Sequence, residues 1–548
     1  MPPTAPMKIL RTGSSGGQAV RPHRARPPLS GHSSGLKGDD SSASLPPRFP
    51  SLRLRRLLIL SAAIALLAGL GFVFIRHLID FPVYYAAGRS LISGRTDLYA
   101  PDFARGPTMD YRYPPFFIVS LIPLWHLPYR AAAYLWHLLG VGGIVACCWA
   151  TSQALLQGRQ TSSDSVALGQ VFGRGRVAIR TLVLTLLGVA QYYVMALHYG
   201  NAQLLVTALL LCGVALAIRN QSLAPGVLLA LAITIKITPA LLLTYFGLKR
   251  RWKLVMTTIG LVVVLNLAPA AYFGFARNAE LVRTWYQHVL VDQQFHEVNG
   301  PINLSLKGQL VRSLTRVDYQ QRLDGDTDYP EVNIAEFSYR DVNKLWLALD
   351  LAVLALGLFL ISWVRPGSPV VAQDGILFDS TQDANLRHER RRPIAEPRLA
   401  APETDDEPLQ AAVGTSRKQQ AIDSTSGSDA TGAPSAPAAG AAGVTFEIGI
   451  MLCLLLLVEP LTSKIYFVAL IWPLAALLDL VVKVPAKIPR LVRWGATAVV
   501  VTNVVLPLLP GREIQRLLLV LGADFYLNCL ILAMLVWSLL AHRRAALN

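Results

Sequence analysis

Long, unbroken runs of apolar residues divide this sequence and restrict the folds open to it. Five of them are 57–75, 131–150, 254–275, 345–364 and 517–540. Each is long enough to cross a hydrocarbon core of about 30 Å, which takes about 20 helical residues. In lipid every backbone amide must be hydrogen-bonded within its own segment, and these runs lack the alternation of barrel strands. The sequence therefore predicts an all-α, polytopic transmembrane helical bundle.

The composition supports a membrane protein and argues against a nucleic-acid-binding one. Hydrophobic residues make up 53% of the chain and charged residues 16%, whereas soluble domains carry about 25% charge. The net charge is +17, and ten of the Lys and Arg residues lie within 1–56. Further basic residues at 249–251 and 543–544 lie at the ends of apolar runs, as the positive-inside rule requires. No aromatic residues are interleaved with the basic run, so we expect no nucleic-acid partner.

Composition also divides the chain into domains. Residues 1–50 are rich in Pro, Ser, Gly and Arg, and are expected to form a disordered basic tail. A first membrane domain is expected over 51–365, a disordered linker over 366–443, and a second membrane domain over 444–548. The five cysteines all lie within apolar runs, which favours small core residues over disulfides or a metal site. We expect no metal and no cofactor.

The number of crossings is the less determined part of the topology. About twelve are predicted, at 57–76, 116–128, 131–153, 181–197, 202–218, 225–246, 254–275, 344–364, 446–461, 465–482, 492–509 and 516–541. An even count leaves both basic ends in the cytoplasm and the loops 77–115 and 276–343 outside. It also leaves the Arg-rich loop 154–180 outside, which is unfavourable. The alternative makes 116–128 re-entrant and breaks 225–246 at Thr238–Pro239.

Asp80 is a candidate functional residue because of its position. It follows the first span directly, at the membrane–water interface, among several aromatic residues. A carboxylate there can reach both a lipid-linked donor in the bilayer and a polar acceptor outside it. Alternatively, Asp80 only caps the next helix, and the aromatic residues form an ordinary interfacial belt.

Several motifs in a fixed order resemble glycosyltransferase family 87. The motif Asp-Phe-x-x-Tyr-Tyr-x-x-Gly begins at Asp80, Gly-x-x-Asp-Leu-Tyr begins at Gly94, and Tyr-x-Tyr-Pro-Pro begins at Tyr111. The similarity continues in Gly-Asn-Ala-Gln at 200–203, Lys-Ile-Thr-Pro at 236–239, Lys-Arg-Arg-Trp at 249–252, and Asn-Leu-Ser-Leu at 303–306 followed by Arg312. It covers about residues 57 to 315 well. The resemblance implies a GT-C-type fold whose extracytoplasmic loops carry the active site.

The resemblance also implies a reaction. It is the transfer of a hexose, expected to be mannose, from a polyprenyl-phosphate sugar to a lipid or glycan acceptor. Such an inverting transfer needs a carboxylate to take the proton of the acceptor hydroxyl, and this role is assigned to Asp80. It also needs groups that stabilise the departing phosphate. The expected substrate-binding residues are Tyr84, Arg112, Tyr113, Asn201, Gln203, Lys236, Asn303, Arg312, Lys464 and Tyr466. The expected location is a plasma membrane, such as a bacterial inner membrane.

Individual roles within this set stay open on sequence alone. Lys236 binds the lipid phosphate or forms a structural ion pair with Asp350, Asp524 or a helix C-terminus. The outer-side cations (Arg112, Arg312 and Lys464) bind phosphate or contact headgroups and loop carboxylates. Asn201 and Gln203 bond a sugar or satisfy a helix start.

The late outer loop departs from the family pattern. Family members commonly show Ser-Pro-x-Ser followed by histidine, whereas this chain has Glu459 before Pro460 and no histidine follows. Two other functions therefore stand beside the transferase. One is a polytopic transporter or lipid flippase, although no internal repeat is visible. The other is a catalytically inactive protein of the same fold.

Overall fold

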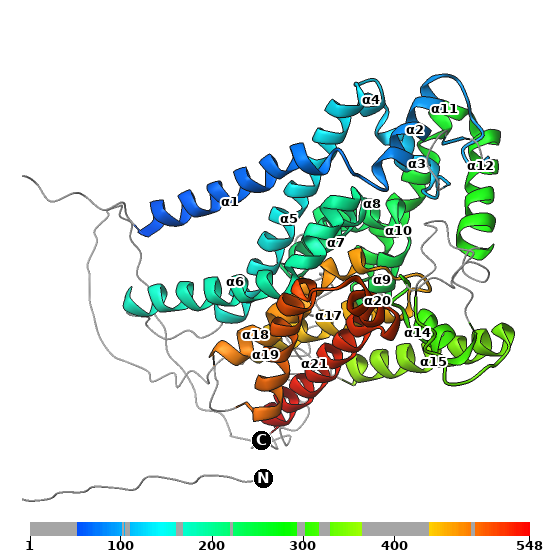
Figure 1. Ribbon diagram of the computed structural model, residues 1–548. Helices are drawn as coiled ribbons and strands as arrows, with labels where there is room; N and C mark the ends of the chain where they lie inside the picture. Colours follow the sequence, from blue (N-terminus) through cyan, green and yellow to red (C-terminus); the bar gives the residue numbers. More distant parts are fainter. Residues whose placement is uncertain are drawn as a thin grey trace, which may run out of the picture. The chain divides into compact units, whose positions relative to one another are not determined.

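The helical elements account for all the regular structure in the part of the chain that the computed structural model describes (Figure 1). That part comprises residues 52–100, 103–104, 110–160, 168–219, 223–292, 302–316, 329–363, 438–483 and 488–547. The predicted tail 1–50 and residues 366–437 of the predicted linker lie outside it. The last six residues of that linker, 438–443, are helical. Residues 61–548 form one compact unit, and 1–60 another, of which only 52–60 are described.

The helical elements occur in the following order along the chain. They are α1 (Leu52–Phe74), α2 (Phe81–Ile92), α3 (Pro115–Ser120), α4 (Ile122–Trp125), α5 (Tyr129–Gln160), α6 (Leu168–Tyr199), α7 (Gln203–Ile218), α8 (Ala224–Ile235), the 3₁₀ turn η1 (Thr238–Ala240), α9 (Leu241–Leu248), α10 (Trp252–Leu267), α11 (Ala270–Phe273), α12 (Phe275–Thr284), the π-helical η2 (Trp285–Asp292), α14 (Leu306–Leu314), α15 (Tyr339–Ser362), α17 (Ala438–Val458), the 3₁₀ helix η4 (Lys464–Leu470), α18 (Ile471–Lys483), α19 (Arg490–Val505), η6 (Leu506–Leu508), α20 (Arg512–Leu521) and α21 (Ala523–Leu547).

Seven helical stretches within the described residues are long and apolar enough to cross a membrane. They are Tyr129–Leu156, Ala178–Tyr199, Trp252–Phe273, Tyr339–Ser362, Lys464–Lys483, Arg490–Leu508 and Ala523–Arg544. Shorter apolar helices occur at Ser61–Phe74, Gln203–Ile218, Ala224–Ile235, Thr238–Leu248 and Gly443–Val458. The chain is therefore a multi-pass helical membrane protein, as predicted, while a total of twelve crossings is not confirmed.

The predicted crossing at 116–128 consists of two short helices, α3 and α4, of six and four residues. Neither approaches the length of about 20 residues that a crossing needs. Pro123 lies in the first turn of α4, where it lacks the amide that would continue the preceding helix. This geometry agrees with the re-entrant alternative and not with a full crossing.

The predicted crossing at 225–246 is likewise broken, into α8 and α9. Lys236 follows α8 with an extended backbone (φ −146°, ψ 125°), and a single 3₁₀ turn separates it from α9. Pro239 explains the break, because it has no amide hydrogen to donate to the carbonyl oxygen of Ile235, four residues earlier. The break turns one apolar segment into two half-helices with a lysine at their junction.

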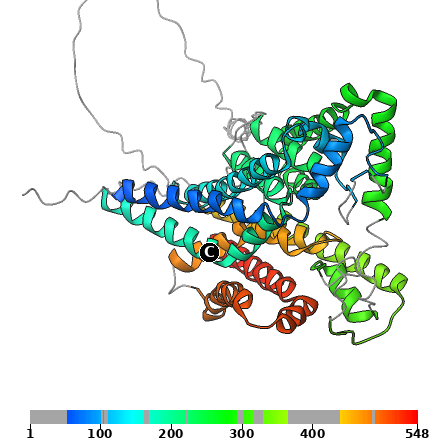
Figure 2. The ribbon, with the colours of Figure 1, turned by 45° about the horizontal axis from the view of Figure 1, so that its top comes forward.

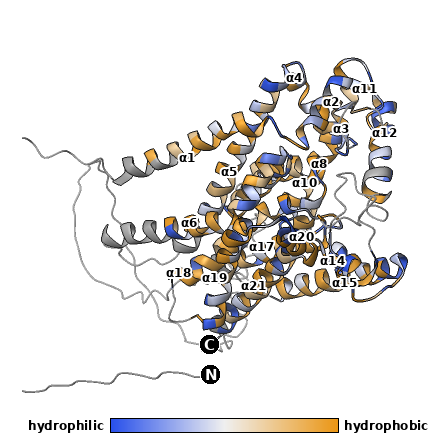
Figure 3. Ribbon diagram, viewed as in Figure 1, coloured by the Kyte–Doolittle hydropathy of each residue, from blue (hydrophilic) through white to orange (hydrophobic). Residues whose placement is uncertain are grey.

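Helices from both ends of the chain pack around one central segment. The stretch η4–α18 is the most enclosed of the seven, with 78% of its most apolar window buried, against 22% for α15. It contacts α5, α6, α17 and α21, while α7 packs between α5 and α8 (Figures 1 and 2). Apolar residues run along most of the outer helix α15, as expected of a lipid-facing surface (Figure 3).

Candidate active site

Asp80 lies at the turn between α1 and α2, and the end of α6 holds this turn in place. The Asp80 amide donates a hydrogen bond of 2.8 Å to the carbonyl oxygen of Tyr199. The next residue, Gly200, has φ +65°, and a Cβ atom there would lie 3.0 Å from Leu78 and 3.1 Å from Phe81. Glycine therefore allows both the left-handed backbone and the close approach of the two segments.

The Asp80 side chain faces Asn201 and does not cap α2. No cap hydrogen bond from the Asp80 side chain is present at α2, so the interpretation of Asp80 as a simple helix cap is wrong. Its Oδ2 accepts a hydrogen bond of 2.7 Å from Nδ2 of Asn201. Burial raises the pKa of Asp80 to about 6, and the Asn201 hydrogen bond partly offsets that rise. Asp80 is thus mostly ionised at neutral pH, and it is a stronger base than an exposed carboxylate.

Asn201 and Gln203 connect Asp80 to the start of α7. Oδ1 of Asn201 accepts a hydrogen bond of 2.8 Å from the backbone amide of Gln203. The Gln203 side chain then accepts a hydrogen bond of 3.2 Å from Nζ of Lys236. The Asn201 side chain therefore satisfies an amide at the helix start and also contacts Asp80. The Gln203 side chain instead bonds Lys236 and Thr207.

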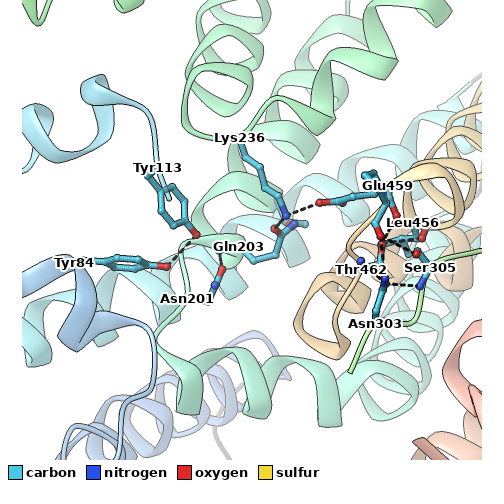
Figure 4. Close-up of polar contacts among 12 residues, drawn as sticks. Tyr84, Tyr113, Asn201, Gln203, Lys236, Asn303, Ser305, Leu456, Glu459 and Thr462 are labelled. Carbon is cyan, nitrogen blue, oxygen red and sulfur yellow. Dashed lines mark hydrogen bonds and ion pairs between the residues drawn. The ribbon is translucent and has the colours of Figure 1, made fainter. Parts of the chain in front are cut away.

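Two tyrosines lie beside these contacts (Figure 4). The hydroxyl of Tyr84, on α2, donates a hydrogen bond of 3.0 Å to the hydroxyl of Tyr113, and their rings pack edge to face. Burial, followed by other nearby groups including the Asp80 charge, raises the pKa of both hydroxyls. Both tyrosines therefore stay neutral at physiological pH and can donate hydrogen bonds.

Lys236 lies between the tyrosine pair and Glu459 in Figure 4. Its Nζ is 2.8 Å from Oε1 of Glu459 and 3.2 Å from the centre of the Tyr466 ring. The Lys236 side chain keeps 19% of its surface exposed, so a ligand can still reach it. Lys236 therefore forms an ion pair, as one of the alternatives predicted. Its partner is Glu459, however, and not Asp350 or Asp524.

Asn303 holds the turn that carries Glu459. Its Nδ2 donates a hydrogen bond of 2.9 Å to the carbonyl oxygen of Pro460, and its Oδ1 accepts one of 3.1 Å from the amide of Thr462. Asn303 is 1% exposed, so its side chain is committed to joining two distant segments. Gly308, on α14, leaves room for this junction, because a Cβ there would overlap the carbonyl oxygen of Asn303.

Arg312 also contributes to this junction. Its Nε donates to the carbonyl oxygen of Val520 at 2.8 Å, Nη1 donates to the carbonyl oxygen of Asn303, and Nη2 donates to Gln309 at 2.9 Å. Arg312 is 1% exposed. These contacts position Asn303, while a role of Arg312 in phosphate binding stays a prediction.

The other two cations of the predicted set, Arg112 and Lys464, lie in different surroundings. Lys464, at the start of η4, forms an ion pair of 3.6 Å with Asp524, which also accepts a hydrogen bond of 2.8 Å from Tyr192. The backbone of Arg112 accepts a hydrogen bond of 3.2 Å from the Trp285 ring. Roles of Arg112 and Lys464 in substrate binding stay predictions.

Five of the predicted residues thus form one connected set with Glu459: Asp80, Asn201, Gln203, Lys236 and Tyr466. The sequence set omitted Glu459 itself. The sequence feature that could have indicated it is this acidic residue, which stands where the family motif commonly has serine.

Within the described residues, no group of three or more His, Cys, Asp and Glu side chains is placed to hold a metal ion.

Comparison with known proteins gives a family match over part of the chain. Residues 111–378 match the model of glycosyltransferase family 87. The chain is therefore similar to this family over just under half of its length. The match includes Tyr113, Asn201, Lys236 and Asn303, whereas Asp80 precedes it and the loop of Glu459 follows it.

A curated protein is also similar to this chain. It is the polyprenol-phosphate-mannose-dependent alpha-(1-2)-phosphatidylinositol pentamannoside mannosyltransferase of Mycolicibacterium smegmatis, 27% identical over 233 residues. The similar region covers 40% of this chain and 50% of that protein. The chain therefore matches about half the length of this relative. No solved structure matches the chain.

Proposed function

We propose that this protein is a membrane glycosyltransferase that moves a hexose, expected to be mannose, from a polyprenyl-phosphate sugar to a lipid or glycan acceptor. The match to family 87 over residues 111–378 and the mannosyltransferase relative support this proposal. The observation that carries it is the connected set of contacts between a carboxylate base and a cation. Asp80 contacts Asn201, Asn201 contacts Gln203, and Gln203 contacts Lys236.

In the proposed reaction, Asp80 acts as the general base. The oxygen of the acceptor hydroxyl forms a bond to C1 of the sugar while its proton passes to the Asp80 carboxylate. The bond between C1 and the phosphate oxygen breaks, and polyprenyl phosphate leaves with the electron pair. Attack opposite the leaving group inverts the configuration at C1. A pKa of about 6 suits this role, because such a base is both ionised and reactive near neutral pH.

Lys236 is proposed to bind the phosphate of the donor. Negative charge on the phosphate increases as the sugar leaves, and a fixed ammonium group stabilises that charge. Lys236 is suited to this role because it sits at a break between two half-helices and is partly exposed. Tyr84 and Tyr113 are proposed to bond the substrate through their neutral hydroxyls. Arg112, Arg312 and Lys464 remain further candidates for phosphate binding.

We further propose a GT-C-type fold in a plasma membrane, as in a bacterial inner membrane, with 116–128 re-entrant and 225–246 forming two half-helices. Asp80 and the loop 276–343 would face outward, and the basic residues at 249–251 and 543–544 would face the cytoplasm. Seven long helices and several shorter apolar ones are compatible with this arrangement.

The proposal is tested by reconstituting the purified protein in vesicles with radiolabelled polyprenyl-phosphate hexoses and a lipid extract containing acceptors. We expect label to appear in a new glycolipid or glycan in a protein-dependent manner. Movement of label across the bilayer without a new product would instead identify a transporter or flippase. Neither movement nor transfer, with folded protein and each hexose donor, would identify an inactive member of the family.

A further inference from the structure

Glu459 is a buried carboxylate, and one of its two oxygens has no hydrogen-bond partner among the described residues. The residue is 8% exposed, and Oε1 pairs with Lys236 at 2.8 Å. The second oxygen, Oε2, is buried and has no hydrogen-bond partner among the residues that the structure describes. Most buried polar side-chain atoms in proteins have a partner, and leaving a charged one unsatisfied is costly. An unsatisfied acceptor beside a partly exposed lysine therefore indicates a ligand that donates a hydrogen bond.

The backbone around Glu459 keeps its carboxylate in place. Its amide donates a hydrogen bond of 3.1 Å to Leu455 at the end of α17, and its carbonyl oxygen accepts one of 3.3 Å from the Thr462 hydroxyl. The following Pro460 restricts the backbone of Glu459 and is itself held by Asn303. The backbone that carries the Glu459 carboxylate is therefore held in a position from which the side chain reaches Lys236 (Figure 4).

The chemistry of the donor narrows the choice of ligand group. A phosphodiester and a polyprenyl chain carry no hydrogen-bond donors, whereas each hydroxyl of the sugar is one. If Lys236 binds the phosphate, the sugar attached to that phosphate begins next to Glu459. The hydroxyl at C2 is the sugar donor group nearest to the anomeric phosphate. Placed between the phosphate and Glu459, it would also offset the repulsion between these two negative charges.

We propose that Oε2 of Glu459 accepts a hydrogen bond from the C2 hydroxyl of the transferred hexose. Glu459 is then a specificity-determining residue, because epimers at C2 point this hydroxyl in different directions. Hydrogen bonds to the 2-hydroxyl strengthen as the sugar approaches an oxocarbenium-like transition state. The expected effect of this contact is therefore on kcat/KM. This inference rests on the proposed function and adds the sugar position that the site recognises.

The test compares three polyprenyl-phosphate donors: mannose, its 2-deoxy analogue and its 6-deoxy analogue. In the wild type, removing the 2-hydroxyl should lower kcat/KM about 10- to 100-fold, as expected for a hydrogen bond to a charged group. In Glu459→Gln this penalty should shrink to a few-fold, because the acceptor is no longer charged. The penalty for the 6-deoxy donor should be the same in both proteins. Asp341→Asn removes an exposed carboxylate on α15, and should keep the full 2-deoxy penalty.

The possible outcomes separate this inference from the proposed function. An equal 2-deoxy penalty in wild type and Glu459→Gln would overturn the inference and leave the transferase proposal intact. So would a wild type that uses the 2-deoxy donor as well as mannose, in which case water satisfies Oε2. A wild type that transfers no hexose would end both proposals. If Glu459→Gln does not fold, Glu459→Asp keeps the charge but draws it back by one methylene, and should also reduce the penalty.

Discussion

Asn201 donates a hydrogen bond of 2.7 Å to the carboxylate of Asp80. The other end of the same amide accepts from the backbone of Gln203 at the start of α7. The position of the proposed base thus depends on a helix start more than 100 residues further along the chain. Asn201 is in this account a positioning residue, since it acts on the reaction through Asp80.

The first prediction concerns the pH dependence of the wild type. Asp80 must be ionised to accept a proton, and burial raises its pKa to about 6. Transfer should therefore be constant above this pH and fall as the pH is lowered through about 6, approaching tenfold per pH unit. The measurement is kcat/KM against pH with saturating acceptor. A limb near pH 4, where exposed carboxylates titrate, would assign the titration to another group.

The second prediction concerns Asn201→Ala. Loss of the hydrogen bond removes an interaction that lowers the pKa of Asp80 and leaves the effect of burial. The acid limb of the pH profile should therefore move to higher pH, with reduced transfer at pH 7. Thr207→Val is a matched control, because it removes a hydrogen bond to Gln203 on the same helix without touching Asp80. An unmoved limb in Asn201→Ala would contradict the positioning role.

The third prediction concerns Lys236→Met. This change removes the cation of the proposed phosphate site, so donor binding should weaken more than turnover. It also leaves Glu459 buried without its counter-charge, which should lower the free energy of unfolding by about 3 kcal/mol. The double variant Lys236→Met with Glu459→Gln separates the two effects. It should recover thermal stability in detergent but not donor affinity, as measured by equilibrium binding. Recovery of both would make Lys236 a purely structural residue.

The fourth prediction concerns the junction that Asn303 makes between the start of α14 and the turn after Glu459. In Gly308→Ala, the new methyl group would overlap the carbonyl oxygen of Asn303, and the repacking should cost about 1–3 kcal/mol of stability. Gly260→Ala on α10 is the control, because a Cβ atom there meets nothing within 4 Å and alanine favours a helix. Melting temperatures in detergent should fall for Gly308→Ala and stay equal or rise for Gly260→Ala. Equal melting temperatures would show that the junction is loose.

Local sequence properties predicted much of the helical architecture. The apolar run at 344–364 forms one long apolar helix with 22% of its most apolar window buried, because its length and hydrophobicity favour a helix locally. The segment 116–128 was harder, because its apolar composition suggested a crossing while its prolines and short length opposed one. For 225–246 the alternative with a break near Pro239 agrees with the structure, since proline acts on the backbone locally.

Pairing between distant residues could not be predicted in this way. The sequence offered Asp350, Asp524 or a helix C-terminus as ion-pair partners for Lys236. The actual partner, Glu459, is selected by how α17 and the junction at Asn303 pack against the break after α8. Arg312 shows the same limitation. Its charge suggested a ligand site, whereas its hydrogen bonds to Val520 and Asn303 arise only from the folded chain.

Turnover of Asp80→Asn tests the central claim most directly. Asparagine keeps the shape of the side chain and can still accept the hydrogen bond from Asn201, but it cannot take a proton. General-base catalysis contributes about 10²–10⁴-fold, so hexose transfer should fall at least about a hundredfold. Binding of the polyprenyl-phosphate donor, measured separately, should remain close to the wild-type value. Near-normal turnover by Asp80→Asn would contradict the account and assign the base to another carboxylate, such as Asp97 or Glu459.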